Sequence, residues 1–293
     1  MKIQLSDHFT FRRLLRFTLP SIAMMIFSSV YIIIDGFFVS NYVGATAFAA
    51  VNLIMPVLMI LSSMGFMIGT GGSALVSMTG KAILRSCLNG SSELMTYIAA
   101  SVVDMLYNMQ LLKYIGEPGV AAYGVIMYYF TVAAGLFMGY SLGAAPVISY
   151  NYGSENTAEL KGLFKKSLIL TGIFSVIVTI ASELGSGFIS SIFVGYDAEL
   201  MNLTVNAFRI YSVAFLFMGF NMFASSFFTA LNNGPVSALI SFARTLVFEV
   251  LSILILPGFL GVDGIWGSVI VAEAAALVLS IICLIIFRKK YKY

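Results

Sequence analysis

The residues best suited to chemistry are carboxylates inside long apolar stretches. Glu93 lies about ten residues into the stretch 83–112, roughly 15 Å deep at a helical rise of about 1.5 Å per residue. A charge at such depth in a bilayer costs at least about 2.5–3.5 kcal/mol, so it is rarely accidental. A buried carboxylate can take up and release a proton, or ligate Na⁺ with nearby hydroxyls such as Ser92 and Thr96. We therefore predict Glu93 as a site that binds a proton or Na⁺, with a structural carboxylate paired inside the protein as the alternative.

Other polar side chains inside such stretches are secondary cavity candidates. Asp104 follows Glu93 by about three helical turns, and Arg244 precedes Glu249 by five residues, a poor spacing for pairing on an α-helix. For the charged members, pairing within the protein is the favoured interpretation, whereas the amides are expected to line a cavity or bond across helices. The full set is Asp104, Asn52, Asn108, Gln110, Asn221, Glu249, Glu273 and Arg244.

Composition decides which elements position these residues. Of 293 residues, 60% are hydrophobic and 10% are charged, against about 25% charged in soluble domains. This excludes a soluble enzyme, a nucleic-acid binder and a disordered chain, and the apolar stretches are too long for β-barrel strands. The predicted fold class is an all-α integral membrane protein. Without a His or Cys cluster or a serine elbow, we expect no enzyme activity, no metal and no cofactor beyond H⁺ or Na⁺ as coupling ion.

Eight stretches are long enough to span a bilayer, which needs about 20 apolar residues. Lys and Arg gather in the N-terminal segment, in alternate connections and at the C-terminus, so the protein is expected in the cell membrane as a multi-pass protein with both termini cytoplasmic. His8, in the N-terminal segment, is expected to be solvated. The predicted spans are Phe17–Ser40, Ala50–Ser77, Ile83–Leu112, Val120–Tyr150, Ser167–Val194, Leu203–Leu231, Val236–Pro257 and Ile265–Phe287.

The first two spans resemble the third and fourth at an offset of 72 residues. Identical pairs include Ser29/Ser101, Tyr42/Tyr114 and Gly44/Gly116, and the Tyr-x-Gly pair recurs in the same connection. Both copies cross in the same direction, so they are parallel repeats, and secondary transporters often bind substrate between such repeats. Spaced glycines predict close helix packing. They are Gly65 and Gly69 in one copy, and Gly135, Gly139 and Gly143 in the other.

Several motifs recur near the ends of the predicted spans. Asp35 follows Tyr31 in Tyr-x-x-x-Asp-Gly-Phe-Phe-Val, Gly71-Gly72-Ser73-Ala74 closes the second span, and Ala145-Pro146-Val147 begins the motif that closes the fourth. Ala230-Leu231-Asn232-Asn233-Gly234 closes the sixth. In order and spacing these motifs resemble those of multidrug and toxic compound extrusion (MATE) transporters. The resemblance implies an antiporter that exports cationic amphipathic compounds in exchange for H⁺ or Na⁺. It also implies that Glu93 and Asp35 bind the coupling ion.

The chain departs from the family pattern after its second span. Residues 1–80 resemble a truncated N-terminal lobe of two spans, and residues 81–293 resemble a complete C-terminal lobe of six. The join lies near Gly80, and four helices of the family's N-terminal lobe have no counterpart in this chain. A homodimer could complete the cavity. Two alternatives remain: a non-transporting remnant left by an internal deletion, and a related lipid-linked oligosaccharide flippase.

Overall fold

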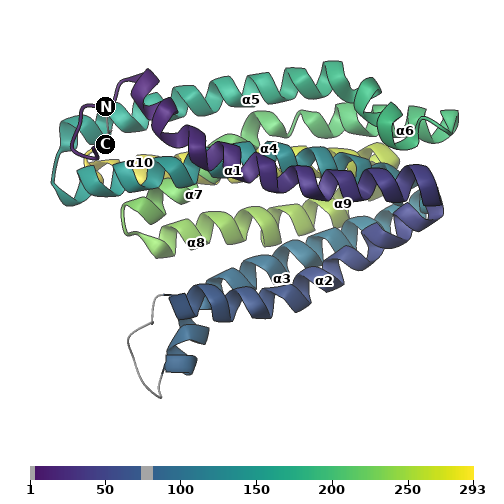
Figure 1. Cartoon of the computed structure of the whole chain (residues 1–293), viewed down its shortest axis with the longest axis horizontal. Coiled ribbons are helices and arrows are strands. Elements are labelled where there is room, and N and C mark those ends of the chain that lie inside the picture. The colour runs from purple at the N-terminus through teal and green to yellow at the C-terminus, as the bar shows by residue number, and fades with distance from the viewer. Residues whose placement is uncertain (1–3, 74–81) are drawn as a thin grey trace.

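The fold is a bundle of long helices running side by side (Figure 1). We describe it from a computed structural model, which covers residues 4–73 and 82–293; between residues 62 and 97 only the helical backbone is described. The helices are α1 Phe11–Phe38, α2 Ala45–Ser73, α3 Ala82–Tyr114, α4 Glu117–Gly153, α5 Thr157–Val194, α6 Ala198–Ser212, α7 Phe215–Ala230, α8 Gly234–Phe242, α9 Val250–Leu260 and α10 Val262–Tyr291, with π-helices η1 Val39–Val43 and η2 Ala243–Glu249.

Seven predicted spans each overlap one helical segment, and Leu203–Leu231 overlaps the bent pair α6–α7. Within the part of the chain that the structure describes, five segments are long and apolar enough to cross a membrane, and the bent pair α6–α7 makes a sixth. These helices identify an integral membrane protein. The segments α2 and α3 lie partly outside the described side chains, so the prediction of eight spans is untested there.

Two helices begin six or more residues earlier than predicted, because capped polar turns precede their apolar stretches. The α1 helix starts at Phe11 instead of Phe17, and the Thr10 hydroxyl caps it by accepting a hydrogen bond of 3.3 Å from the Arg13 N–H. The α5 helix starts at Thr157 instead of Ser167, where the Asn156 side chain accepts from the Glu159 N–H. Hydropathy marks the apolar stretch, whereas the cap marks the helix end.

The predicted span Leu203–Leu231 is not one straight helix, because α6 and α7 meet at an angle of 47°. At the break, the amides of Val213 and Ala214 bond three residues back instead of four, to Ile210 and Tyr211. No Pro or Gly interrupts residues 210–216, so nothing in the local sequence marks the break.

The repeat predicted from sequence recurs in the backbone. The α2 helix begins directly after Gly44 and α4 directly after Gly116, with φ angles of +110° and +90°. Each glycine N–H bonds five residues back, at 3.2 Å to the Val39 carbonyl and at 3.0 Å to the Leu111 carbonyl. Because such φ angles favour glycine, the matched turns explain why Gly recurs at this offset.

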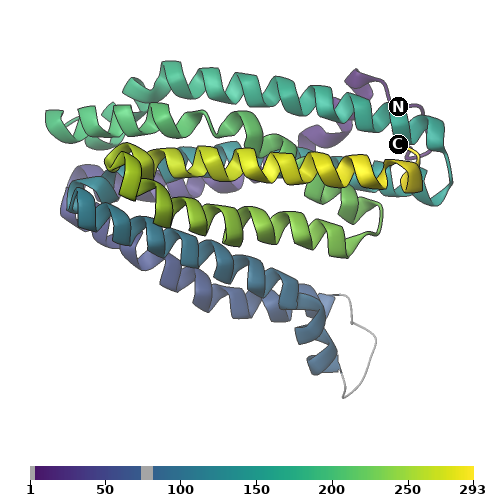
Figure 2. The ribbon, with the colours of Figure 1, turned by 180° about the vertical axis from the view of Figure 1, so that it is seen from behind.

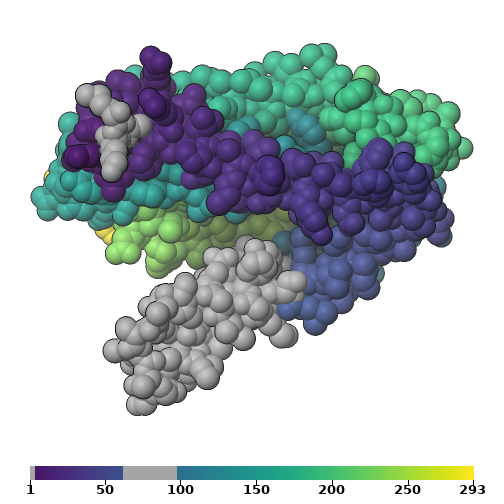
Figure 3. Space-filling view, in the orientation of Figure 1, coloured from purple at the N-terminus to yellow at the C-terminus, as the bar shows by residue number. Residues whose placement is uncertain are grey.

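The two copies pack reciprocally. The α1 helix lies against α4 and α2 lies against α3, the pattern expected when a two-fold relation exchanges the copies. The α2–α3 pair diverges from the remaining helices, as seen from both sides (Figures 1 and 2). In a space-filling view, α1 crosses the front of the bundle (Figure 3).

The predicted glycine packing is confirmed for the second copy. A Cβ added at Gly139 would lie 2.6 Å from the Ile22 Cα, and one at Gly143 would lie 2.8 Å from the Thr18 Cα. The backbones of α1 and α4 therefore touch where α4 has no side chain. The matching pair, Gly65 and Gly69, lies outside the described side chains.

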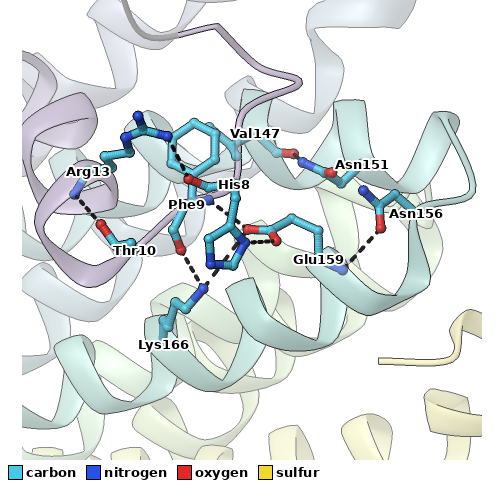
Figure 4. Close-up of polar contacts among 9 residues, drawn as sticks. All are labelled: His8, Phe9, Thr10, Arg13, Val147, Asn151, Asn156, Glu159 and Lys166. Atoms are coloured by element: carbon cyan, nitrogen blue, oxygen red, sulfur yellow. Dashed lines mark hydrogen bonds and ion pairs between the residues drawn. The ribbon is translucent and has the colours of Figure 1, made fainter.

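Both termini lie at the same end of the bundle (Figure 2), where Glu159 anchors the N-terminal segment (Figure 4). Its Oε2 lies 2.6 Å from the His8 Nδ1, and its Oε1 accepts a 2.8 Å hydrogen bond from the Phe9 N–H. The Lys166 ammonium lies 3.9 Å from Glu159 and donates to the Phe9 carbonyl. His8 is therefore not merely solvated, although its side chain is 69% exposed.

Candidate functional site

A cavity of about 500 Å³, here named the central cavity, opens among the two copies of the repeat, α6 and η2. Its volume is within the range of small-molecule sites, about 300–1,000 Å³. Its lining residues come from six elements. They are Ile32, Asn52, Met55, Pro56, Met59, Ala100, Val103, Asp104, Asn108, Tyr123, Gly124, Met127, Tyr128, Phe130, Thr131, Tyr211, Arg244, Thr245 and Glu249.

The two copies of the repeat contribute equivalent residues to the central cavity. Five pairs that are equivalent at the offset of 72 belong to its lining. At Asn52 and Gly124 the equivalent residues meet, since a Cβ on Gly124 would lie 2.1 Å from the Asn52 Nδ2. The cavity therefore occupies the position between repeats where secondary transporters bind substrate. The equivalent pairs in its lining are Ile32/Asp104, Asn52/Gly124, Met55/Met127, Pro56/Tyr128 and Met59/Thr131.

Two carboxylates in the lining form no ion pair with any residue that the structure describes. Asp104, on α3, accepts a 3.1 Å hydrogen bond from the Tyr123 hydroxyl, and the Tyr123 ring stacks on Tyr107 at 5.2 Å. Glu249, the last residue of η2, makes no hydrogen bond or ion pair within the described part of the chain. Both are half-buried. The cavity wall therefore presents two carboxylates to whatever enters it.

The π-helix explains how Arg244 and Glu249 share one face. On an α-helix, residues five apart point about 140° apart at 3.6 residues per turn. A π-helix bonds residue i to i+5, so residues five apart lie nearly above one another. Both side chains consequently line the cavity, although their spacing is poor for pairing on an α-helix.

Arg244 pairs with Glu273 of α10. Its Nε and Nη2 donate to the Glu273 Oε1 at 2.8 and 2.5 Å. The Asn221 Nδ2 of α7 donates to the Glu273 Oε2 at 2.7 Å and to its carbonyl at 2.9 Å, and the Ser280 hydroxyl donates to the Asn221 Oδ1 at 3.0 Å. The predicted structural pairing is thus found for Arg244 and Glu273.

The predicted site residues separate into three groups. Asp104, Asn52, Asn108, Arg244 and Glu249 line the cavity, and the buried Asn108 Oδ1 has no hydrogen-bond partner there. Asn221 and Glu273 lie outside the lining, buried within the polar network, and Gln110 is not in the lining either.

The two predicted coupling-ion residues are placed differently. Asp35 lies on an exposed side of α1, outside the cavity lining. Glu93 lies on α3, but its side chain is outside the described residues. The coupling roles of both therefore remain predictions.

No individual residue of the apolar and aromatic part of the lining was predicted from the sequence. Met55, Met59 and Met127 supply flexible, polarizable surface, and Tyr128 and Phe130 supply rings that can contact a cation. Some of these lining residues could have been predicted from the repeat, because Met55 matches Met127 and Pro56 matches Tyr128 at the same offset.

Comparisons with known proteins agree with this architecture. The multidrug export protein MepA of Staphylococcus haemolyticus (strain JCSC1435) is 22% identical over 195 residues, covering 66% of this chain and 42% of MepA. An inward-facing structure of a multidrug resistance MATE family transporter of the MOP superfamily matches with a TM-score of 0.69 at 18% identity, covering 74% of this chain and 50% of that one. This chain thus spans about half the length of these two proteins.

A further solved structure is similar over a larger share. A MATE protein crystallised in complex with MaL6 matches with a TM-score of 0.72 at 13% identity, covering 97% of this chain and 98% of that chain. The profile of the MatE family matches residues 94–255, more than half of the sequence, and this range includes α4–α8 and most of α3. The chain belongs to the MatE family of membrane transporters.

Proposed function

We propose that this protein exports cationic amphipathic compounds in exchange for H⁺ or Na⁺, with the central cavity as its substrate site. The observation that carries the proposal is that Asp104 and Glu249 line a largely apolar cavity and form no ion pair with the described residues. A cation with apolar groups matches both properties, because it supplies the missing charge and contacts the methionine and aromatic surface. The substrate is moved unchanged, without an enzymatic step or cofactor.

Exchange follows if ion and substrate compete for the same carboxylates. A proton or Na⁺ on Asp104 or Glu249 removes the negative charge that attracts the substrate, so the two exclude each other. Glu93 and Asp35 are further coupling-ion candidates on the resemblance to the family. We also propose that both termini are cytoplasmic in the cell membrane; their position at one end of the bundle agrees with this.

The length of the matched relatives bears on the assembly. Since the chain spans about half of MepA, a homodimer that completes a larger cavity is part of the proposal. The same observation favours the alternative that the chain is a non-transporting remnant. A lipid-linked oligosaccharide flippase is the third possibility. Its anionic substrate requires positive charge, and the cavity's Arg244 is already paired with Glu273.

Transport by the purified chain in liposomes tests the proposal. We expect ethidium uptake into inside-out-oriented liposomes when a proton or Na⁺ gradient is imposed. Asp104→Asn and Glu249→Gln should each reduce the rate about ten-fold, since each removes a charge from the site. Asp263→Asn, which removes an exposed carboxylate at the start of α10, is the matched control and should transport normally.

The outcomes separate the candidate functions. Ethidium that binds to the chain but is not transported under either gradient indicates the remnant. Transport that is unaffected by both cavity substitutions rules out this cavity as the substrate site. Chemical cross-linking in the same liposomes reports whether the active form is a dimer.

A further inference from the structure

We infer that Glu273 is a positioning residue that holds Arg244 away from Glu249 and so leaves Glu249 free to bind a cation. The inference rests on the proposed function, because it assumes that the central cavity binds a cationic substrate. Glu273 itself lies outside the cavity lining. Its effect is exerted through Arg244, the cavity residue that it binds.

Arg244 has two carboxylates within the same region of the fold. Glu273 reaches it from α10, and Glu249 shares its face of η2 because of the π-helical spacing. Arg244 and Glu249 also interact electrostatically, yet only the bond to Glu273 is formed. The side chain of Arg244 is therefore committed to one of two available partners.

Burial explains this choice. Glu273 is 4% exposed, so leaving its charge without Arg244 would be costly, whereas Glu249 is half-buried and faces a cavity large enough for water. The second oxygen of Glu273 is occupied by Asn221, which is fixed in turn by Ser280. This network orients the carboxylate toward Arg244 before any substrate is present.

The charge of the cavity depends on this arrangement. With Arg244 neutralised by Glu273, the charge that faces a substrate is that of Asp104 and Glu249. Without Glu273, Arg244 is free to pair with Glu249 and competes with an incoming cation for it. Removing a carboxylate that never contacts the substrate should thus weaken cation binding through Arg244.

Equilibrium binding of ethidium to the full chain in lipid nanodiscs, read by fluorescence anisotropy, tests the inference. We expect Glu273→Gln to raise the Kd about ten-fold, close to the effect of Glu249→Gln. The double variant Arg244→Gln/Glu273→Gln should return the Kd to within about two-fold of wild type, because the competing cation is gone. A merely structural role predicts that the Kd recovers only where the melting temperature also recovers, so thermal unfolding of each variant is measured beside the Kd.

Each outcome decides between explanations. Unchanged binding in Glu273→Gln, or a double variant that binds no better than the single one, overturns the inference. Should Glu273→Gln fail to fold, Asn221→Ala loosens Glu273 without removing a charge. If Asn221→Ala weakens ethidium binding and adding Arg244→Gln to it restores binding, the inference is supported. Any other result contradicts it. The proposed function fails separately if wild type does not bind ethidium, or if Asp104→Asn and Glu249→Gln bind it as wild type does.

Discussion

The two copies of the repeat share a backbone plan but differ in the chemistry that they bring to the cavity. Both pass through a glycine turn at Gly44 or Gly116 with the same five-residue hydrogen bond. At equivalent positions, however, the first copy places Ile32 where the second places Asp104. The comparison teaches that a repeat determines where a position points, whereas the residue at that position determines its role.

The copies also differ in their surroundings. In the most apolar window of the α1 segment 17% of the residues are buried, against 61% in α4, although the two helices pack against each other. α4 is central because it also contacts α5, α6 and α7, so its glycines and small residues are enclosed on several sides. Equivalent substitutions should therefore have unequal effects in the two copies.

The largest expected effect comes from breaking the contact between the copies. Gly139→Leu places a side chain where a Cβ alone would lie 2.6 Å from the Ile22 backbone, and we expect a loss of about 3 kcal/mol in the free energy of unfolding. Thermal unfolding in detergent measures it. Gly267→Leu is the control, since a Cβ there meets nothing within 4 Å. Equal melting of the two variants would falsify the close packing of α1 on α4.

The next largest effect is expected when the cavity carboxylate is moved from the second copy of the repeat to the first. Asp104→Ile should weaken ethidium binding about ten-fold by removing a cavity charge. Adding Ile32→Asp, which moves the carboxylate to the equivalent position in the other copy, should recover part of that loss. Binding in nanodiscs measures both variants. Failure of the second substitution to recover any binding would show that the two positions are not interchangeable.

A smaller effect concerns the anchor at the start of the first copy. Glu159→Gln keeps the shape of the side chain but removes the charge that His8 and Lys166 share, and should cost about 1–2 kcal/mol. Limited proteolysis near residue 8 should accelerate, because the anchor holds that segment against α5. Glu155→Gln, an exposed residue that forms no ion pair with the described residues, is the control. Equal cleavage of both variants contradicts the anchoring role.

The smallest expected effect comes from the contact between the equivalent residues Asn52 and Gly124. Gly124→Ala introduces a methyl group that meets the end of the Asn52 side chain, so we expect a loss of about 1 kcal/mol or less. Asn52→Ala in the same chain should relieve the strain, which thermal unfolding of the double variant would report. If the two substitutions are simply additive, Asn52 and Gly124 do not meet as described.

Local patterns predicted much of the fold. Long apolar stretches with few charges gave the helices, and the Tyr-x-Gly motif revealed the repeat, because both depend on neighbouring residues. The bend between Ser212 and Phe215 and the π-helix at Ala243–Glu249 were not predictable in this way. No Pro or Gly marks either, so packing decides them.

The candidate site, like the fold, was predicted from the sequence only in part. Asp104, Asn108 and Glu249 could be named from sequence, since charged and amide residues within apolar stretches stand out. That these residues line one cavity could not be predicted from the sequence, because the cavity brings together elements that are far apart in the chain. Glu159 was missed for a related reason: its partner His8 is 151 residues away.

The sequence by itself determined that this is a helical membrane protein with an internal repeat, since composition and periodicity set how each segment meets lipid. It also determined where the costly charges lie along the chain. Only the tertiary structure decided which charges are paired and which face the cavity. Arg244 could have paired with Glu249 on its own helix, but the buried Glu273, held by Asn221, is the partner that cannot be left without a counter-charge.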